Sequence, residues 1–437
     1  MINVNEICEN LGVNSKGELT INNVSTVDLA KKYQTPLYVL DEDRIRYNCR
    51  VYTSAVKTAF GDNGGVLFAS KALSFKKIYS IISEEGMGID VVSQGEIYTA
   101  KSAGFNLQNA YFHSNNKTDE DIVYAIDNGI GYFVVDNSEE LLAIDNISLT
   151  KGVKSKVLLR LTPGIDPHTY DEVATGKVDS KFGSSIETGQ AFEITSLALS
   201  LKNITLVGFH CHVGSQVFDA SVYIKTADVM LNFIKLVKDK LGYETEHLDL
   251  GGGYGVRYVS SDPYIDIKSN ILEVGNYIKS KVISLKIKMP KIFFEPGRSI
   301  VADAGLTIYT VGTVKRITGY KNYVSVDGGM TDNPRFALYK SKYTVVPAYN
   351  LTIERDIVAS VVGRCCESGD IIQENVSMPS TIKRGDIIAC LTTGAYNYSM
   401  SSNYNKVLKP MVVMVNSEKD YVAVKRQTLE DLASLDV

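Results

Sequence analysis

Short runs of apolar and β-branched residues alternate with longer amphipathic segments between residues 65 and 296. The short runs have the length of buried strands, and the longer segments have the apolar spacing of helices, several closed by a glycine. The pattern predicts eight strands, at residues 65–70, 88–93, 110–114, 131–136, 156–161, 206–213, 247–252 and 291–296. Eight strand–helix units in a row favour an α/β fold of the (β/α)8 TIM-barrel type over a doubly wound sheet, which normally has fewer strands.

After residue 296 the pattern changes to strands with few helices between them. These strand-like runs lie at residues 307–317, 322–329, 343–348, 356–363, 386–394, 409–416 and 420–426. They predict a C-terminal all-β domain, to which the strand-like N-terminal segment 17–25 contributes. We therefore expect a barrel domain over residues 36–296 and a β-rich domain formed by residues 1–35 and 297–437.

Composition and charge exclude several classes of protein. The chain has 437 residues and a net charge of −4. It is not basic enough for a typical nucleic-acid binder, its sequence is not of the low complexity typical of disordered proteins, and it is not apolar enough for a membrane protein. Its first residues lack the charged leader and apolar run of a targeting signal, so we expect a cytoplasmic protein. Its six cysteines contain no CxxC pair, which favours free thiols over disulfides or a zinc site.

The predicted strand ends carry a set of residues suited to chemistry. In TIM barrels the active site lies at the C-terminal ends of the strands. The residues found there are Lys71, Asp90, His113, Arg160, His212, Gly251, Gly252, Gly253 and Glu295. Each one alone would most often be solvated or structural, but together they form a candidate site.

Four features of this set fit pyridoxal 5'-phosphate (PLP). Lys71 follows an apolar strand among small residues, which leave room for a covalent adduct on its amine. Residues 251–253 are glycines, whose bare backbone N–H groups can approach a phosphate. His212 offers a flat ring, and Glu295 offers a buried carboxylate that would keep a pyridine nitrogen protonated. The sequence therefore predicts a PLP site.

A metal site is the competing interpretation. His210 and His212 share one face of their predicted strand, as metal ligands of a TIM-barrel hydrolase would. The remaining histidines, His113, His168 and His247, form no second ligand motif, so we expect no metal.

Ten motifs, in order along nearly the whole chain, carry a resemblance to a known family. They are "FASKAL", "GIDVVSQGEIYTA", "HSNNK", "SKFG", "GFHCHVGSQ", "LDLGGGYG", "EPGRSIVADAG", "VDGGMTDNPRFALY", "GRCCESGD" and "GAYNYSMSSNYN". The chain resembles the alanine-racemase-like (fold type III) PLP-dependent decarboxylases, and among them the diaminopimelate decarboxylases. The resemblance implies PLP-dependent decarboxylation of meso-2,6-diaminopimelate to L-lysine and carbon dioxide, the last step of lysine biosynthesis, by a homodimer with shared active sites.

The resemblance also implies a role for individual residues. Lys71 carries the cofactor, and Cys366, inserted by the partner subunit, is the proton donor, whereas Cys365 is a packing residue. Cofactor binding is implied for Lys71, Asp90, His212, Ser215, Gly251, Gly252, Gly253, Glu295, Gly297, Arg298 and Tyr396. Substrate binding is implied for Arg298, Arg335, Tyr339, Glu367 and Tyr396.

Two further functions stay open at this point. A related decarboxylase acting on ornithine, lysine or carboxynorspermidine would keep the cofactor site but have no use for Arg298, Arg335 and Tyr339 together. A non-catalytic PLP-binding homologue would be expected to lose Lys71 or Cys366, and the chain keeps both. The long stretch 164–190 is a candidate lid, since long loops in compact domains are often functional.

Overall fold

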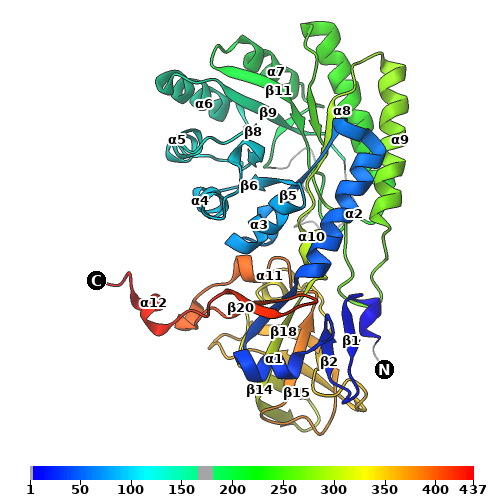
Figure 1. Ribbon diagram of the computed structural model, residues 1–437, viewed down its shortest axis with the longest axis vertical. Coiled ribbons are helices and arrows are strands. Elements are labelled where there is room, and N and C mark those ends of the chain that lie inside the picture. The colour runs from blue at the N-terminus through cyan, green and yellow to red at the C-terminus, as the bar shows by residue number, and fades with distance from the viewer. Residues whose placement is uncertain (1–2, 166–180) are drawn as a thin grey trace. The chain divides into compact units, whose positions relative to one another are not determined.

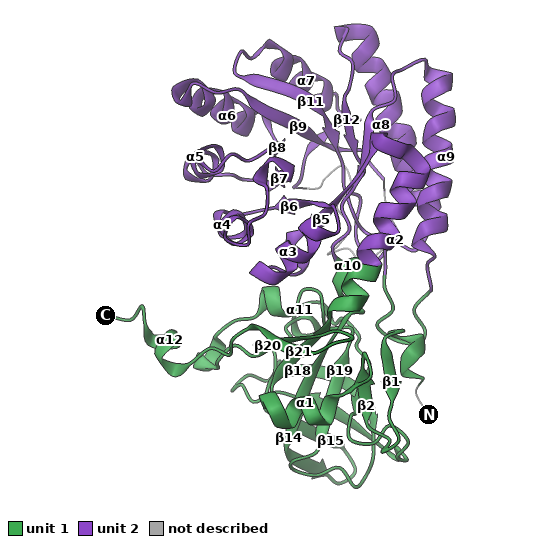
Figure 2. Cartoon of the chain, in the orientation of Figure 1, with its two compact units in different colours: residues 1–47, 256–263, 298–437 green, residues 48–255, 264–297 purple. Residues whose placement is uncertain are grey.

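The computed structural model describes residues 3–165 and 181–437, which fall into two units (Figure 2). The barrel unit comprises residues 48–255 and 264–297, and the β unit comprises residues 1–47, 256–263 and 298–437. The domain bounds expected from the sequence stay a prediction. His168 and most of the candidate lid 164–190 fall within residues 166–180. These residues lie outside the part of the chain that the structure describes.

Eight parallel strands form the centre of the barrel unit. They are β5 (Gly64–Ala69), β6 (Gly88–Val91), β7 (Ala110–Phe112), β8 (Tyr132–Val135), β9 (Ser155–Thr162), β11 (Ile204–His210), β12 (His247–Asp249) and β13 (Lys291–Phe294). Each strand pairs with the next in this order, and β13 pairs with β5, so the ring of strands closes. Each strand overlaps one of the predicted strands, and the predicted TIM barrel is confirmed.

Helices surround these strands in Figure 1. They are α2 (Glu42–Phe60), α3 (Lys76–Glu84), α4 (Gln94–Ser102), α5 (Asp119–Asp127), α6 (Ser138–Lys151), α7 (Gln190–Ser200), α8 (Ala220–Leu241) and α9 (Ile267–Leu285). Their ends follow local chemistry. Thr118 and Asp121 form a capping box at the start of α5, and Gly152 and Gly242 end α6 and α8 in the left-handed conformation.

Along three of the barrel strands, a buried apolar residue is followed two positions later by a polar one. One buried cluster contains Tyr111, Leu158 and Phe293, each from a different strand. Two positions further along the same strands come His113, Arg160 and Glu295, which therefore lie on the same strand faces. The apolar residues therefore form a layer nearer the strand starts, and the polar residues form the next layer toward the strand ends.

The β unit contains two sheets. The larger has the strands β4 (Leu37–Asp41), β14 (Gly305–Ile317), β15 (Lys321–Val326), β16 (Val345–Pro347), β17 (Ile357–Val362), β18 (Ile371–Met378), β19 (Ile387–Leu391), β20 (Met411–Val415) and β21 (Asp420–Val424). The smaller has β1 (Leu11–Val13), β2 (Leu19–Ile21) and β3 (Val24–Ser25). The unit also contains the short α-helices α1 (Thr26–Tyr33), α10 (Arg298–Val301), α11 (Arg335–Tyr339) and α12 (Leu429–Ala433).

Two strands of the larger sheet were not predicted. β4 lies within the range 36–296 expected for the barrel, but it pairs with β14 and β20 of the β unit. β18 pairs with β17 across two irregularities in register. In the barrel unit, a two-residue strand, β10 (Ser184–Ser185), pairs in parallel with β9.

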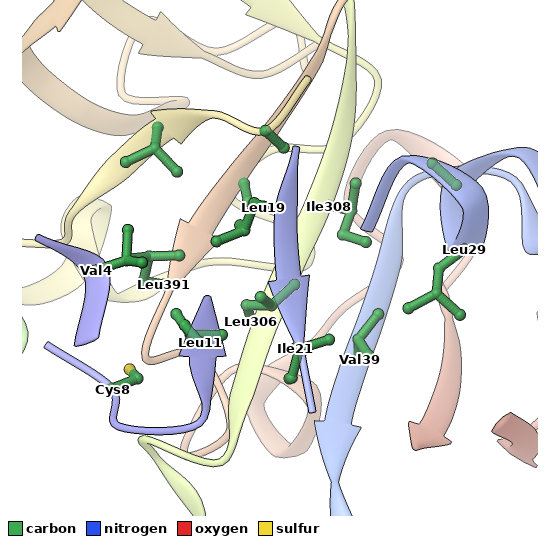
Figure 3. Packing of buried hydrophobic residues seen from close by; sticks show 14 of the residues in the cluster. Val4, Cys8, Leu11, Leu19, Ile21, Leu29, Val39, Leu306, Ile308 and Leu391 are labelled. Atoms are coloured by element: carbon green, nitrogen blue, oxygen red, sulfur yellow. The ribbon is translucent and has the colours of Figure 1, made fainter. Parts of the chain in front are cut away.

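The N-terminal segment shares a core with the larger sheet. Leu19 and Ile21 of β2 pack in one buried cluster with Leu306 and Ile308 of β14 and Leu391 of β19 (Figure 3). The expected contribution of the N-terminal segment to the β-rich region is confirmed.

No helix within residues 3–165 and 181–437 combines the length and the apolar character needed to cross a membrane.

We predict that Leu306→Ala destabilises the protein by about 2–5 kcal/mol, because Leu306 is 1% exposed and its truncation leaves a cavity in the cluster of Figure 3. Urea denaturation followed by circular dichroism measures the shift. Leu429→Ala, at a leucine that is 67% exposed, is the matched control and should change stability by less than about 0.5 kcal/mol. Equal shifts in the two variants would contradict the assigned core.

Candidate active site

A buried carboxylate, Glu295, lies just after β13 at the C-terminal end of the barrel. It accepts a hydrogen bond from His210 Nε2 at 3.0 Å, and its other oxygen lies 2.9 Å from His113 Nε2. His210 ends β11 and His113 follows β7, so three strands that are distant in sequence supply the three groups. The closed barrel is what brings them together.

The charge state of Glu295 follows from these contacts. Burial alone would raise the pKa of Glu295, but the contacts with His113 and His210 lower it well below its ordinary value. Burial lowers the pKa of His210 from 6.5 to about 4, so its ring is neutral at neutral pH and serves as a hydrogen-bond donor. Glu295 is therefore an ionised carboxylate within the barrel.

Lys71 lies on the short turn that follows β5. The lysine is exposed, and its charge acts on both Asp90 and His212. Burial raises the pKa of Asp90, while His113 and Lys71 oppose that shift. Burial, reinforced by the charges of Lys71 and Arg160, lowers the pKa of His212 well below 6.5, so this ring is also neutral. The barrel thus presents an accessible amine beside a flat, uncharged imidazole.

The glycine run after β12 is shaped by close approach of neighbouring backbone. Gly251 and Gly253 have φ values of +70° and +124°, and a side chain on Gly252 would clash with the carbonyl oxygen of Glu295. Among the described residues, no acceptor lies within hydrogen-bonding reach of the N–H groups of Gly252 and Gly253. These two donors are available to a phosphate group.

Gly297, also predicted to bind the cofactor, is packed against the turn that carries Lys71. A Cβ atom there would lie 2.9 Å from Cβ of Ala69 and 3.1 Å from Cβ of Ala72. Ser215 follows Gly214, whose φ is +154°, at the end of the β11 region. The amine, the neutral imidazole, the ionised carboxylate and the backbone donors of the barrel unit together fit PLP.

The two histidines suggested as metal ligands, His210 and His212, do not fall in the same group of possible ligands. Among the described residues, His113, His210 and Glu295 have ligand atoms within 4.8 Å of one another, and His212 is not part of this group. The 2.9 and 3.0 Å contacts within the group are those of a carboxylate held by two imidazoles.

The β unit contains a buried cluster of arginine and tyrosine side chains. Arg298 Nη1 donates a hydrogen bond to the Tyr258 hydroxyl at 2.6 Å, and Arg335 Nη1 donates one to the Tyr343 hydroxyl at 2.7 Å. The Arg298 guanidinium also lies 4.7 Å from the centre of the Tyr396 ring. Tyr396 has a φ of +60°, a conformation that non-glycine residues adopt rarely and that is common near functional sites.

Sequence reasoning missed Tyr258 and Tyr343. Neither belongs to a motif used above, and the chain has 26 tyrosines. The one sequence feature that points to Tyr258 is its position shortly after the "GGGYG" run, where the chain enters the β unit. Tyr339, predicted to act with Arg335, ends the same short helix and is 44% exposed.

The segment 363–370 presents Cys366 and Glu367 outward. Both side chains are exposed, whereas Asp370 is buried and accepts hydrogen bonds from the backbone N–H of Met330 at 2.6 Å and of Cys365 at 2.7 Å. The N–H of Cys366 donates to Asn405 Oδ1 at 2.8 Å. Burial and the nearby Asp370 raise the pKa of Cys365 to about 11, so Cys365 is a poor proton donor.

The predicted site residues thus fall into two sets. The barrel unit holds Lys71, Asp90, His212, Ser215, Gly251, Gly252, Gly253, Glu295 and Gly297. The β unit holds Arg298, Arg335, Tyr339, Cys366, Glu367 and Tyr396. Their roles stay a prediction.

Comparison with known proteins points to one family. The family described as "Pyridoxal-dependent decarboxylase, pyridoxal binding domain" matches residues 44–302. A diaminopimelate decarboxylase of Bacillus methanolicus is 42% identical over 97% of this chain and 98% of its own length. Two crystal structures of diaminopimelate decarboxylases complexed with L-lysine are similar. The one from M. jannaschii has a TM-score of 0.90 and 31% identity over 98% of both chains. The one from Helicobacter pylori has a TM-score of 0.84 and 31% identity, covering 94% of this chain and 98% of its own.

The neutral state of His210 predicts a loss of stability in acid. Below a pH of about 6.5 the unfolded chain takes up a proton that the folded ring, with its pKa of about 4, does not take up. The free energy of unfolding should therefore fall between these two pH values, by up to about 1.4 kcal/mol per pH unit for this one group. Urea denaturation at pH 7.5, 6.0 and 5.0 measures the fall, and His210→Gln, whose amide can still donate to Glu295, should reduce it. An unchanged pH dependence in the variant would show that folding does not lower the pKa of His210.

Proposed function

The chain belongs to the pyridoxal-dependent decarboxylases, in their diaminopimelate decarboxylase family, and on that basis we propose that it converts meso-2,6-diaminopimelate to L-lysine and carbon dioxide. The L-lysine complexes of the two similar crystal structures support this product. Within the chain, the observation that carries the substrate assignment is the pair of buried arginines, Arg298 and Arg335, since a diamine precursor with one carboxylate gives such a pair no second anion to bind.

The barrel residues serve the cofactor. PLP, when bound, withdraws electrons from the carbon that loses its carboxyl group. Lys71 Nζ would be its covalent attachment point, and the neutral His212 ring would stack on it. Glu295, ionised and fixed by His113 and His210, holds a proton on the ring nitrogen. Gly252 and Gly253 donate their N–H groups to the phosphate, with Ser215 and Gly297 beside them, and Asp90 adds a carboxylate near Lys71.

The residues of the β unit serve the substrate. Arg298 and Arg335 bind the carboxylate that is kept, because a planar guanidinium can bind a carboxylate at two points, and Tyr339 and Tyr396 assist them. Glu367 binds the distal ammonium group. When the bond to the departing carboxyl group breaks, its electron pair stays on carbon, and Cys366 Sγ gives that carbon a proton and later recovers one from water.

Cys366 and Glu367 are exposed, and we propose that they act in the active site of a second copy of the chain. The protein would then be a homodimer with shared sites, and as a biosynthetic enzyme it would work in the cytoplasm. Two alternatives are a related decarboxylase that acts on ornithine, lysine or carboxynorspermidine and a non-catalytic PLP-binding homologue. No described contact favours either one over the diaminopimelate reaction.

We predict that Lys71→Ala abolishes release of carbon dioxide and L-lysine from meso-diaminopimelate, because it removes the attachment point of the cofactor. Lys76→Ala, which removes another exposed lysine nearby, should keep turnover. Faster turnover of L-ornithine or L-lysine than of diaminopimelate by the wild-type protein would overturn the substrate. Stoichiometric zinc or iron in an active preparation without PLP would overturn the cofactor.

The adjacent cysteines allow a matched pair of variants. Cys366→Ser should lower kcat by about a hundredfold or more, as expected when a proton donor is replaced by a far weaker acid. Cys365→Ser should leave kcat within about twofold, because Cys365 is turned toward Asp370. Similar losses in both variants would mean that the loop, and not the Cys366 thiol, matters.

The same variants test the shared site. Mixing Lys71→Ala with Cys366→Ser subunits under conditions of exchange should restore about one quarter of wild-type activity, because half of the randomly formed dimers then contain one intact site. A mixture as inactive as its components would contradict a site built from two subunits.

A further inference from the structure

A buried tyrosine, Tyr258, contacts both arginines of the β unit. Its hydroxyl accepts the 2.6 Å hydrogen bond from Arg298, and its ring centre lies 5.1 Å from the guanidinium carbon of Arg335. Tyr258 is 5% exposed and lies in the segment 256–263, which is distant in sequence from both arginines. One side chain therefore holds both guanidinium groups, through its hydroxyl and its ring face.

A second tyrosine, Tyr343, completes the arrangement. Its ring stands at 87° to the ring of Tyr258, with the centres 5.2 Å apart. Its hydroxyl accepts hydrogen bonds from Arg335 Nη1 at 2.7 Å and from Asn397 Nδ2 at 3.3 Å. Both arginines thus contact tyrosine hydroxyls, and the two tyrosines pack edge to face, which fixes their relative position.

The partners of Arg335 are tyrosine side chains. No carboxylate of the described residues forms an ion pair with Arg335, although this side chain is only 7% exposed. A buried cation without an anion is costly, and a hydroxyl partner orients the guanidinium without neutralising it. Arg335 is consequently prepared for an incoming anion, because hydroxyl partners take few of the five N–H donors of a guanidinium.

The charges at Tyr258 agree with this geometry. Burial would raise the pKa of a phenol, yet Arg298 and Arg335 lower the pKa of Tyr258 below its ordinary value of 10.0. The charges of both arginines therefore act on the hydroxyl of Tyr258, the residue that contacts both of them.

We propose that Tyr258, together with Tyr343, is a positioning residue that orients Arg298 and Arg335 for the carboxylate retained by the substrate. The inference rests on the proposed function, which assigns that carboxylate to these arginines. It goes further in identifying what holds the arginines, and it makes Tyr258 a determinant of selectivity for ligands that carry a carboxylate.

The test compares two ligands that differ by one carboxylate. L-lysine and cadaverine have the same carbon chain and both amines, but only L-lysine has a carboxylate. In the PLP-loaded enzyme, Tyr258→Phe should raise the Kd of L-lysine about tenfold and leave that of cadaverine within about twofold, since only the carboxylate meets the arginines. The KM for meso-diaminopimelate should rise about as much, with kcat within about threefold of wild type.

Two further variants make the outcome decisive. Tyr343→Phe, which removes the hydroxyl held by Arg335, should act in the same direction. Tyr243→Phe, which removes a hydroxyl that donates only to the Leu206 carbonyl of the barrel unit at 3.0 Å, should change neither Kd. Thermal unfolding and the cofactor absorbance check that each variant is folded and loaded, and if Tyr258→Phe does not fold, the result for Tyr343→Phe decides.

Unchanged L-lysine affinity in Tyr258→Phe and Tyr343→Phe, or equal losses for L-lysine and cadaverine, would overturn the inference. Failure of the proposed function has a different signature, because the wild-type enzyme would then not turn over meso-diaminopimelate at all.

Discussion

The burial of an ionised carboxylate at Glu295 is the constraint on which the barrel site depends. A carboxylate in this position is stable only if polar groups surround it, and here His210 donates a hydrogen bond to one oxygen while His113 Nε2 lies 2.9 Å from the other. These residues come from β7 and β11, while Glu295 follows β13. The carboxylate is therefore held only when the barrel has closed in the register that aligns these strand ends.

This constraint links the fold to the chemistry of the cofactor. The neutral imidazole of His210 donates to Glu295 without cancelling its charge, so Glu295 can hold a proton on the pyridine nitrogen of PLP. The β unit orients its buried charges with tyrosine side chains, because tyrosine hydroxyls accept hydrogen bonds from Arg298 and Arg335. In both units, hydrogen bonds to buried rings orient a buried charge.

Most of the barrel and its site could be predicted from the sequence, because parallel strands buried on both faces appear as short apolar runs and barrel chemistry lies at their ends. Lys71 and Glu295 were found in this way. β4 was not predicted as part of the second sheet, since its run "LYVLD" has the same composition as a barrel strand and only long-range pairing with β14 and β20 decides its place. Arg335 and Cys366 were found through the family resemblance alone. Tyr258 could not be found from local pattern, because its role depends on contacts with residues far along the chain.

The proposed chemistry requires that Lys71, on the turn after β5, carries the cofactor. Borohydride reduction of the PLP-loaded protein, followed by mass mapping of its peptides, tests this. We expect one cofactor mass per chain, on the peptide that contains Lys71. Labelling of a different lysine, or no labelling in a protein that turns over diaminopimelate, would contradict it.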